Sequence, residues 1–258
     1  MNIRQIAGMS PNYYEISREE RNYAAIFFAA LCKPGNAEKF LKYCGFESII
    51  GPEFGIYFEY AYLRDMWNHI IGEEPRKNII RNKLQINNIE KILSKTPIEI
   101  NTIFGIGGKT SSAFIQNPGK WSILKYNQHF PDNDDFLKIC MFKWSFNIKP
   151  DIVIHLDKDR SICIEAKYES REGSYPATDK EKGIFRSREI EYVGQMELQK
   201  YMMEELLGVK TDFMFLVFKK EKSATHKVIS WAEAFGAIEM KDMPKFAIEM
   251  AKIISGEA

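Results

Sequence analysis

The sequence has few cysteines and histidines, and nothing in their spacing suggests a metal cage. Among its 258 residues there are four of each. The cysteines never form a CxxC pair and are widely separated, at Cys32, Cys44, Cys140 and Cys163. This argues against a zinc site and indicates buried thiols in a reducing cytoplasm.

Long hydrophobic runs are also lacking. The longest, YAAIFFAALC, is about half of what a membrane span needs, and the N-terminus has no apolar signal core. We therefore expect a soluble, cytoplasmic protein without membrane contact.

Charge of one sign is not in excess either. The chain has 36 basic and 35 acidic residues, a formal net charge of +1. Any nucleic-acid surface must then come from local segregation of charge. The hydrophobic content of 45% and charged content of 28% are those of a globular chain and exclude extended disorder.

Helical patterns dominate the first 95 residues. Ser17 is a candidate N-cap, with Glu20 three residues later as in a capping box, for a helix that ends at Pro34-Gly35. Two further helices are predicted over 55–72 and 75–95. The region from 97 to 131 is irregular and rich in turn residues.

The second half of the chain alternates strands and helices. The patterns predict strands at 152–156, 161–168 and 211–219, an edge strand near 226–232, and a long loop over 169–194. Helices are predicted over 132–146, 194–208 and 244–256. The strand at 211–219 should run parallel to that at 161–168. The predicted fold class is α/β, with a mixed central sheet flanked by helices.

The first two of these strands carry charge on one face. Alternate side chains of a strand share a face, so Glu165 and Lys167 lie together, opposite an apolar face. A three-residue turn at 157–159 makes Asp151 pair with Glu165. A four-residue turn would place the two carboxylates on opposite faces.

The motif Pro150-Asp151 followed by Glu165-Ala166-Lys167 resembles that of the PD-(D/E)XK nuclease superfamily, which has a restriction-endonuclease-like fold. The resemblance covers roughly the last 110 residues. It implies a nuclease core over 131–258, and a mostly helical region over 1–130 that serves recognition or dimerisation or is inserted into the core. The implied function is metal-dependent endo- or exonucleolytic hydrolysis of DNA, with RNA as an alternative, in restriction, defence or DNA repair.

The resemblance also implies roles for these residues. Asp151, Glu165 and the main-chain carbonyl of Ala166 would bind Mg²⁺, for which Mn²⁺ substitutes. Two carboxylates suffice, because Mg²⁺ prefers oxygen ligands and keeps several waters. Lys167 would orient water and offset charge on the phosphate, and its carboxylate neighbours should keep it protonated.

Two further site residues are proposed by the resemblance. Gln195, on the helix after the motif, would face the site, although it could instead only cap that helix. An acidic residue on the first core helix would complete the metal shell. We favour Glu20 for this role, with Glu59 as the alternative.

Basic residues follow the motif and could hold a phosphate backbone. They are Arg171, Lys180, Lys182, Arg186 and Arg188. Acidic residues are interleaved with them, so a simple solvated loop is the competing interpretation. Likewise, Glu165 and Lys167 alone would describe a solvated surface pair. The alternative function is a catalytically inactive nucleic-acid-binding or protein-interaction domain on the same fold, and a homodimer is compatible with either function.

Overall fold

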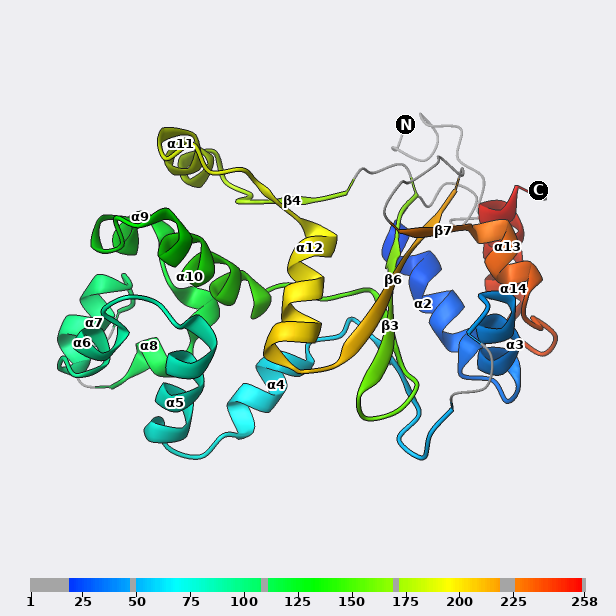
Figure 1. Ribbon diagram of the computed structural model, residues 1–258. Coiled ribbons are helices and arrows are strands. Elements are labelled where there is room, and N and C mark those ends of the chain that lie inside the picture. The colour runs from blue at the N-terminus through cyan, green and yellow to red at the C-terminus, as the bar shows by residue number, and fades with distance from the viewer. Residues whose placement is uncertain (1–18, 47–49, 108–110, 169–171, 219–225, 257–258) are drawn as a thin grey trace, which may run out of the picture. The chain divides into compact units, whose positions relative to one another are not determined.

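The computed structural model describes residues 19–46, 50–107, 111–168, 172–218 and 226–256, which form two compact units (Figure 1). The sheet unit comprises Met1–Tyr60, Pro150–Arg171 and Thr211–Ala258, and the helical unit comprises Ala61–Lys149 and Glu172–Lys210. This division differs from the predicted boundary between residues 130 and 131. The sheet unit takes residues from both sides of that boundary, and the helical unit is inserted into it at two points in the sequence.

A mixed sheet forms the centre of the sheet unit, as predicted, and it has a fifth strand, β1, that was not predicted. Its order is β1-β2-β3-β6-β7, with β1/β2 and β2/β3 antiparallel and β6/β7 parallel. The backbone N–H of Lys167, just after β3, donates to the carbonyl of Leu216 in β6 at 2.7 Å. The strands are β1 (Gly55–Phe58), β2 (Ile152–His155), β3 (Arg160–Ala166), β6 (Lys210–Val217) and β7 (Lys227–Ser230).

The prediction of one helix over 55–72 is wrong. Gly55–Phe58 is a strand in which Ile56 lies opposite Ile154 of β2, and only Tyr62–His69 is helical, as α4. Ile56 and Phe58 pack against the core of the sheet unit, whereas Tyr57 between them is 44% exposed. This alternation has the period of a strand, not of a helix.

Four helices pack with one face of the sheet and enclose the core of this unit. They are α2 (Glu20–Leu31), α3 (Asn36–Tyr43), α13 (Trp231–Gly236) and α14 (Lys245–Ser255), which lie together on one side of the sheet in Figure 1. Their apolar side chains pack in one cluster with Ile152, Ile154, Ile162 and Ile164. The helix α2 begins at Glu20 with Glu19 as its N-cap, so the predicted Ser17 cap is wrong; Ser17 itself lies outside the described residues.

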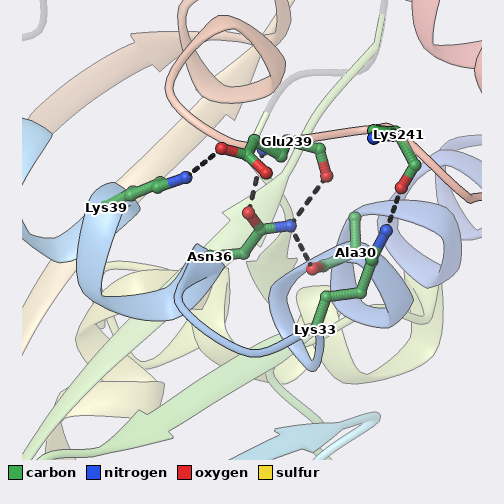
Figure 2. A network of polar contacts seen from close by, with 6 residues as sticks. All are labelled: Ala30, Lys33, Asn36, Lys39, Glu239 and Lys241. Atoms are coloured by element: carbon green, nitrogen blue, oxygen red, sulfur yellow. Dashed lines mark hydrogen bonds and ion pairs between the residues drawn. The ribbon is translucent and has the colours of Figure 1, made fainter.

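Asn36 joins the start of the sheet unit to its end (Figure 2). Its side-chain amide donates to the carbonyls of Ala30 and Glu239, at 2.8 and 2.9 Å, and its oxygen accepts from the N–H of Glu239 at 2.9 Å. Lys39 pairs with the Glu239 carboxylate, and Lys33 donates to the carbonyl of Lys241. A buried amide bonded at three points fixes the α2–α3 turn against the segment between α13 and α14.

The helical unit is built from short helices around an aromatic core. The predicted helix over 75–95 is divided into α5 and α6, because Gln85 and Asn88 adopt left-handed backbone angles, with φ of 46° and 61°. The helices are α4, α5 (Glu73–Leu84), α6 (Ile89–Leu93), α7 (Pro97–Ile103), α8 (Ala113–Gln116), α9 (Ile123–Tyr126), α10 (Asn133–Ser145), α11 (Asp179–Ser187) and α12 (Gln195–Lys200), which continues as the π-helix η4 (Tyr201–Leu206). Two single-turn 3₁₀ segments, η2 (Pro118–Lys120) and η3 (Asn127–His129), complete it. In the parts of the chain that the structure describes, no helix is long and apolar enough to cross a membrane.

The prediction of a loop over 169–194 is also wrong for half of that range, of which residues 169–171 lie outside the described residues. Two short strands, β4 (Ser174–Tyr175) and β5 (Val193–Gly194), pair with each other and enclose α11. Thr178 caps α11 by accepting a hydrogen bond from the N–H of Glu181, and Phe185 is buried. One buried aromatic side chain and one cap thus hold a helix in a segment whose composition is that of a loop.

Candidate functional site

The hairpin of β2 and β3 has the predicted register. Leu156 donates its N–H to the carbonyl of Arg160 at 2.9 Å, which leaves a turn of three residues, 157–159. Ile152 lies opposite Ile164, and one further step in the same register brings Asp151 opposite Glu165. The prediction that these two carboxylates share a face of the sheet is therefore confirmed.

Asp151 is fixed to both neighbouring strands. Its Oδ2 accepts a hydrogen bond from the N–H of Ala166 at 2.8 Å. Its carbonyl accepts from the N–H of Glu59 at 2.9 Å, just beyond the end of β1. The carboxylate is thus held at the end of the sheet where the motif residues of β3 emerge.

The environment of Asp151 disfavours its charge. Burial and, next, the negative charge of Glu165 raise the pKa of Asp151 to about 7, with a smaller contribution from Glu59. The Ala166 N–H and the Lys167 ammonium act in the opposite direction. Two carboxylates that lie together in a buried position repel each other. Because a proton or a cation relieves this repulsion, such a pair retains one or the other.

Glu165 and Lys167 do not form a solvated surface pair. Lys167 Nζ contacts Glu165 Oε1 at 2.9 Å, and the two side chains are only 14% and 3% exposed. Burial acts to lower the pKa of Lys167, but Glu165, Glu20 and Asp151 outweigh it and the pKa is raised. The lysine is thus held as an ammonium ion, as predicted.

The two further acidic candidates both lie near residues of the motif, Glu20 near Lys167 and Glu59 near Asp151. Glu20, in the first turn of α2, contributes to the raised pKa of Lys167, and Glu59 contributes to that of Asp151. Glu59 has a left-handed backbone with φ of 52°, and its Oε1 is 2.9 Å from Nε of Arg21. A left-handed non-glycine residue is strained, and such strain often occurs at functional sites.

Two residues that support the site were not identified from the sequence. Arg21 pairs with Glu59, and Trp231 donates its indole N–H to the carbonyl of Lys167 at 3.1 Å. Arg21 directly follows Glu20 in the sequence and lies on the surface of α2. This position next to a predicted site residue was the one feature of the sequence that could have identified Arg21. Trp231 is distant in sequence from the motif, and no local pattern connects the two.

Gln195 belongs to the helical unit, where it is the first residue of α12. Its Oε1 accepts from the N–H of Gly173 at 3.3 Å, and its own N–H donates to the Gly173 carbonyl at 2.9 Å. Glu172, which the sequence did not single out, accepts from the N–H of Met196 at 2.9 Å. These contacts attach the start of α12 to the segment before β4.

The predicted phosphate-binding residues are divided between exposed and structural positions. Lys180 and Arg186 on α11 are exposed and Lys182 is half-buried, while Arg171 lies outside the described residues. Arg188 donates to the carbonyls of Asn127 and Phe130 at 2.7 and 2.8 Å and to the side chain of Asn127 at 2.7 Å. Its guanidinium, which also lies 4.2 Å from the ring centre of Phe136, is occupied inside the helical unit.

Among the described residues, no group of three or more His, Cys, Asp or Glu side chains is arranged to hold a metal ion. Asp151, Glu165 and Glu20 therefore do not form the three-carboxylate metal shell that the resemblance implies.

Comparison of the chain with protein-family models, with curated proteins and with solved structures finds no match. The function is accordingly inferred from the site itself.

Proposed function

We propose that the protein is a metal-dependent nuclease that hydrolyses phosphodiester bonds of DNA. The observation that carries this proposal is the placement of Asp151, Glu165 and Lys167 on one face of the β2–β3 hairpin. This is the arrangement expected from the resemblance to PD-(D/E)XK nucleases. A solvated pair of surface charges does not account for it, because both members of the Glu165–Lys167 pair are largely buried.

The residues fit a Mg²⁺ ion of the kind expected. Asp151 and Glu165 bring two carboxylates together, and the pKa of Asp151 near 7 reflects their repulsion as well as burial. A site with one or two carboxylates is sufficient for Mg²⁺, which retains water ligands. Asp151, Glu165 and the carbonyl of Ala166 would hold the ion, which would supply positive charge at the attacking and leaving oxygens of the phosphodiester.

Lys167 acts as a fixed positive charge and not as a base. The raised pKa of its ammonium keeps it protonated at neutral pH, and Glu165 Oε1 sets its position. An ammonium held in this way stabilises negative charge that develops on the phosphate in the transition state. Trp231 restrains the same residue through its carbonyl.

The basic residues of α11 provide a surface for the phosphate backbone. Lys180, Lys182 and Arg186 lie on this one helix, and the first and last of them are exposed. Contacts of this kind bind nucleic acid without reading its sequence. Arg188 is not part of this surface, because its donors are used by protein acceptors.

The proposal is tested by incubating the full chain with linear, circular and single-stranded DNA and with RNA, in Mg²⁺, in Mn²⁺ and in a chelator. Asp151→Asn and Lys167→Gln should each reduce the single-turnover cleavage rate by about a hundredfold or more. Asp159→Asn and Lys158→Gln, in the exposed turn of the same hairpin, are the matched controls. Cleavage by the two site variants at the parent rate would overturn the proposal.

A catalytically inactive nucleic-acid-binding domain is the second candidate. It is favoured by one observation: within the described residues, no cluster of three or more metal-binding side chains exists. In that case the protein would bind DNA and retard its migration in a gel in a salt-dependent manner, and neither Mg²⁺ nor Mn²⁺ would produce cleavage.

A further inference from the structure

A cavity in the helical unit has the size and composition of a binding site. Its volume is about 490 Å³, and it lies between α6 and the segment that leads into α10. Cavities that bind small molecules are about 300–1,000 Å³ and combine apolar walls with a few polar groups. Its apolar wall includes Ile92, Ile103, Phe130 and Pro131. None of its lining residues belongs to the nuclease site.

Three basic residues, Lys91, Lys95 and His129, line the cavity, and Lys91 belongs to α6. Neither Lys91 nor Lys95 forms an ion pair with any other residue that the structure describes. The pKa of the exposed Glu99 carboxyl is lowered mainly by hydrogen bonds from Thr96, and the charge of Lys95 makes a smaller contribution in the same direction. Two ammonium groups at one cavity are a site for an anion such as a phosphate.

Two acidic residues that also line the cavity, Asp132 and Asp135, are fixed by hydrogen bonds from the backbone. Asp135, which is buried, accepts the N–H of Asn87 at 3.0 Å, and Asp132 accepts the N–H of Asp135 at 2.9 Å. These bonds use only part of the acceptor capacity of a carboxylate, which has about four lone-pair positions. The two carboxylates can therefore also accept hydrogen bonds from a ligand, while their negative charge repels an anion from their own part of the cavity.

We propose that this cavity binds a nucleotide whose base carries an amino group. The phosphate lies at Lys91 and Lys95, the flat base contacts the apolar wall of Ile92 and Phe130, and the amino group donates to the two aspartates. A bare phosphate would leave the apolar wall without a partner. A base without an amino group would leave the remaining lone pairs of the two aspartates without a donor from the ligand.

The nucleotide is either free or part of a nucleic-acid strand, and the chemistry is the same in both cases. The inference does not rest on the proposed nuclease activity, because the cavity shares no residue with that site. It can be tested by binding alone, without metal and without cleavage.

The test is equilibrium binding to the full chain in a chelator, by calorimetry. The probes are adenosine monophosphate, uridine monophosphate, inorganic phosphate, and single-stranded oligodeoxyadenylate and oligothymidylate. Adenosine monophosphate should bind about tenfold or more tightly than uridine monophosphate or phosphate. Binding of the oligodeoxyadenylate in preference to the oligothymidylate, with no binding of any mononucleotide, would support the proposal and identify the strand as the source. Equal binding of the two oligonucleotides and of no mononucleotide would assign the binding to the backbone surface of α11 and overturn it.

Lys91→Gln combined with Lys95→Gln should weaken that binding by about tenfold or more, because charge-assisted bonds to the phosphate are lost. Lys138→Gln, on an exposed position of α10 outside the cavity, is the matched control and should bind as the parent does. Circular dichroism and the melting temperature establish that the double variant is folded. Failure of all probes to bind, equal binding of phosphate and adenosine monophosphate, or unchanged binding by the folded double variant would each overturn the proposal.

Discussion

The carboxylate of Asp151 and the backbone N–H of Ala166 are joined by a hydrogen bond of 2.8 Å. This bond connects the residue before β2 to the middle residue of Glu165-Ala166-Lys167. Because it involves the backbone of β3, a shift of either strand end moves Asp151 and the other two residues together. The relative position of the three side chains is therefore set by the hairpin and not by a flexible loop.

Removal of the Lys167 side chain should destabilise the protein. In Lys167→Ala the buried Glu165 carboxylate loses its ammonium at 2.9 Å, and breaking a buried ion pair costs about 3 kcal/mol or more. Lys158→Ala, at a side chain that is 72% exposed, should change the free energy of unfolding by less than about 0.5 kcal/mol. Urea denaturation in a chelator measures both. Equal stability of the two variants would mean that the buried pair makes no net contribution.

The stability of the metal-free protein should fall as the pH rises from about 4 to about 7. Asp151 has a pKa of about 7 in the folded protein against an ordinary 3.8, so the folded state binds the proton more tightly than the unfolded state. This contribution is complete below the unfolded value and is lost as the pH passes through the folded value. Asp151→Asn should flatten the profile and be more stable than the parent at pH 8.

The check on this profile is a series of urea denaturation curves between pH 5 and pH 8. Asp159→Asn, at an exposed carboxylate in the hairpin turn, should keep the slope of the parent. A parent profile that Asp151→Asn leaves unchanged would show that another group titrates in this range.

Divalent cations should raise the melting temperature more at pH 8 than at pH 6. A ligand that binds only the folded state stabilises it, and a metal ion must displace the proton that Asp151 retains up to about pH 7. Asp151→Asn should abolish the shift, which thermal denaturation with Mg²⁺ or Mn²⁺ measures, and Asp159→Asn should preserve it. An undiminished shift in Asp151→Asn would place the metal elsewhere.

Arg188 and Arg186 should have opposite effects when replaced by glutamine. Arg188→Gln removes bonds to the carbonyls of Asn127 and Phe130 and should reduce the free energy of unfolding by about 2 kcal/mol or more. Arg186→Gln, at an exposed position, should leave stability within about 0.5 kcal/mol of the parent but weaken DNA binding. Denaturation curves and gel retardation separate the two roles. Weaker DNA binding by a fully stable Arg188→Gln would contradict the structural role.

The register of the β2–β3 hairpin was predictable because it depends only on residues that are close together in the sequence. The parity of Asp151 and Glu165 and the length of the 157–159 turn decide which side chains share a face, and both can be read from neighbouring residues. The position of Glu20 near Lys167 could be proposed only from the family resemblance, because α2 and β3 are far apart in the sequence.

The strand β1 was not predictable in the same way. Its partner β2 begins about ninety residues later, and the aromatic run after Gly55 suits a helix and a strand equally. The pairing of this segment with β2, which is distant in the sequence, makes it a strand. The helix α11, by contrast, had a readable start: Thr178 precedes Glu181 at the spacing of a capping box, within a segment whose other residues are those of a loop.

The backbone N–H of Tyr60 donates to the carbonyl of Pro150 at 2.9 Å, so the chain leaves the sheet and returns to it at neighbouring points. For the sheet, residues 61–149 are equivalent to the loop of a hairpin. Closing a loop costs entropy that increases only slowly with its length, so such a position accepts an extra domain without disturbing the strands. The same geometry lets a tight Asn-Gly turn replace residues 61–149, so that β1 follows directly into β2, in a smaller protein from which the second part of the helical unit, Glu172–Lys210, is removed as well.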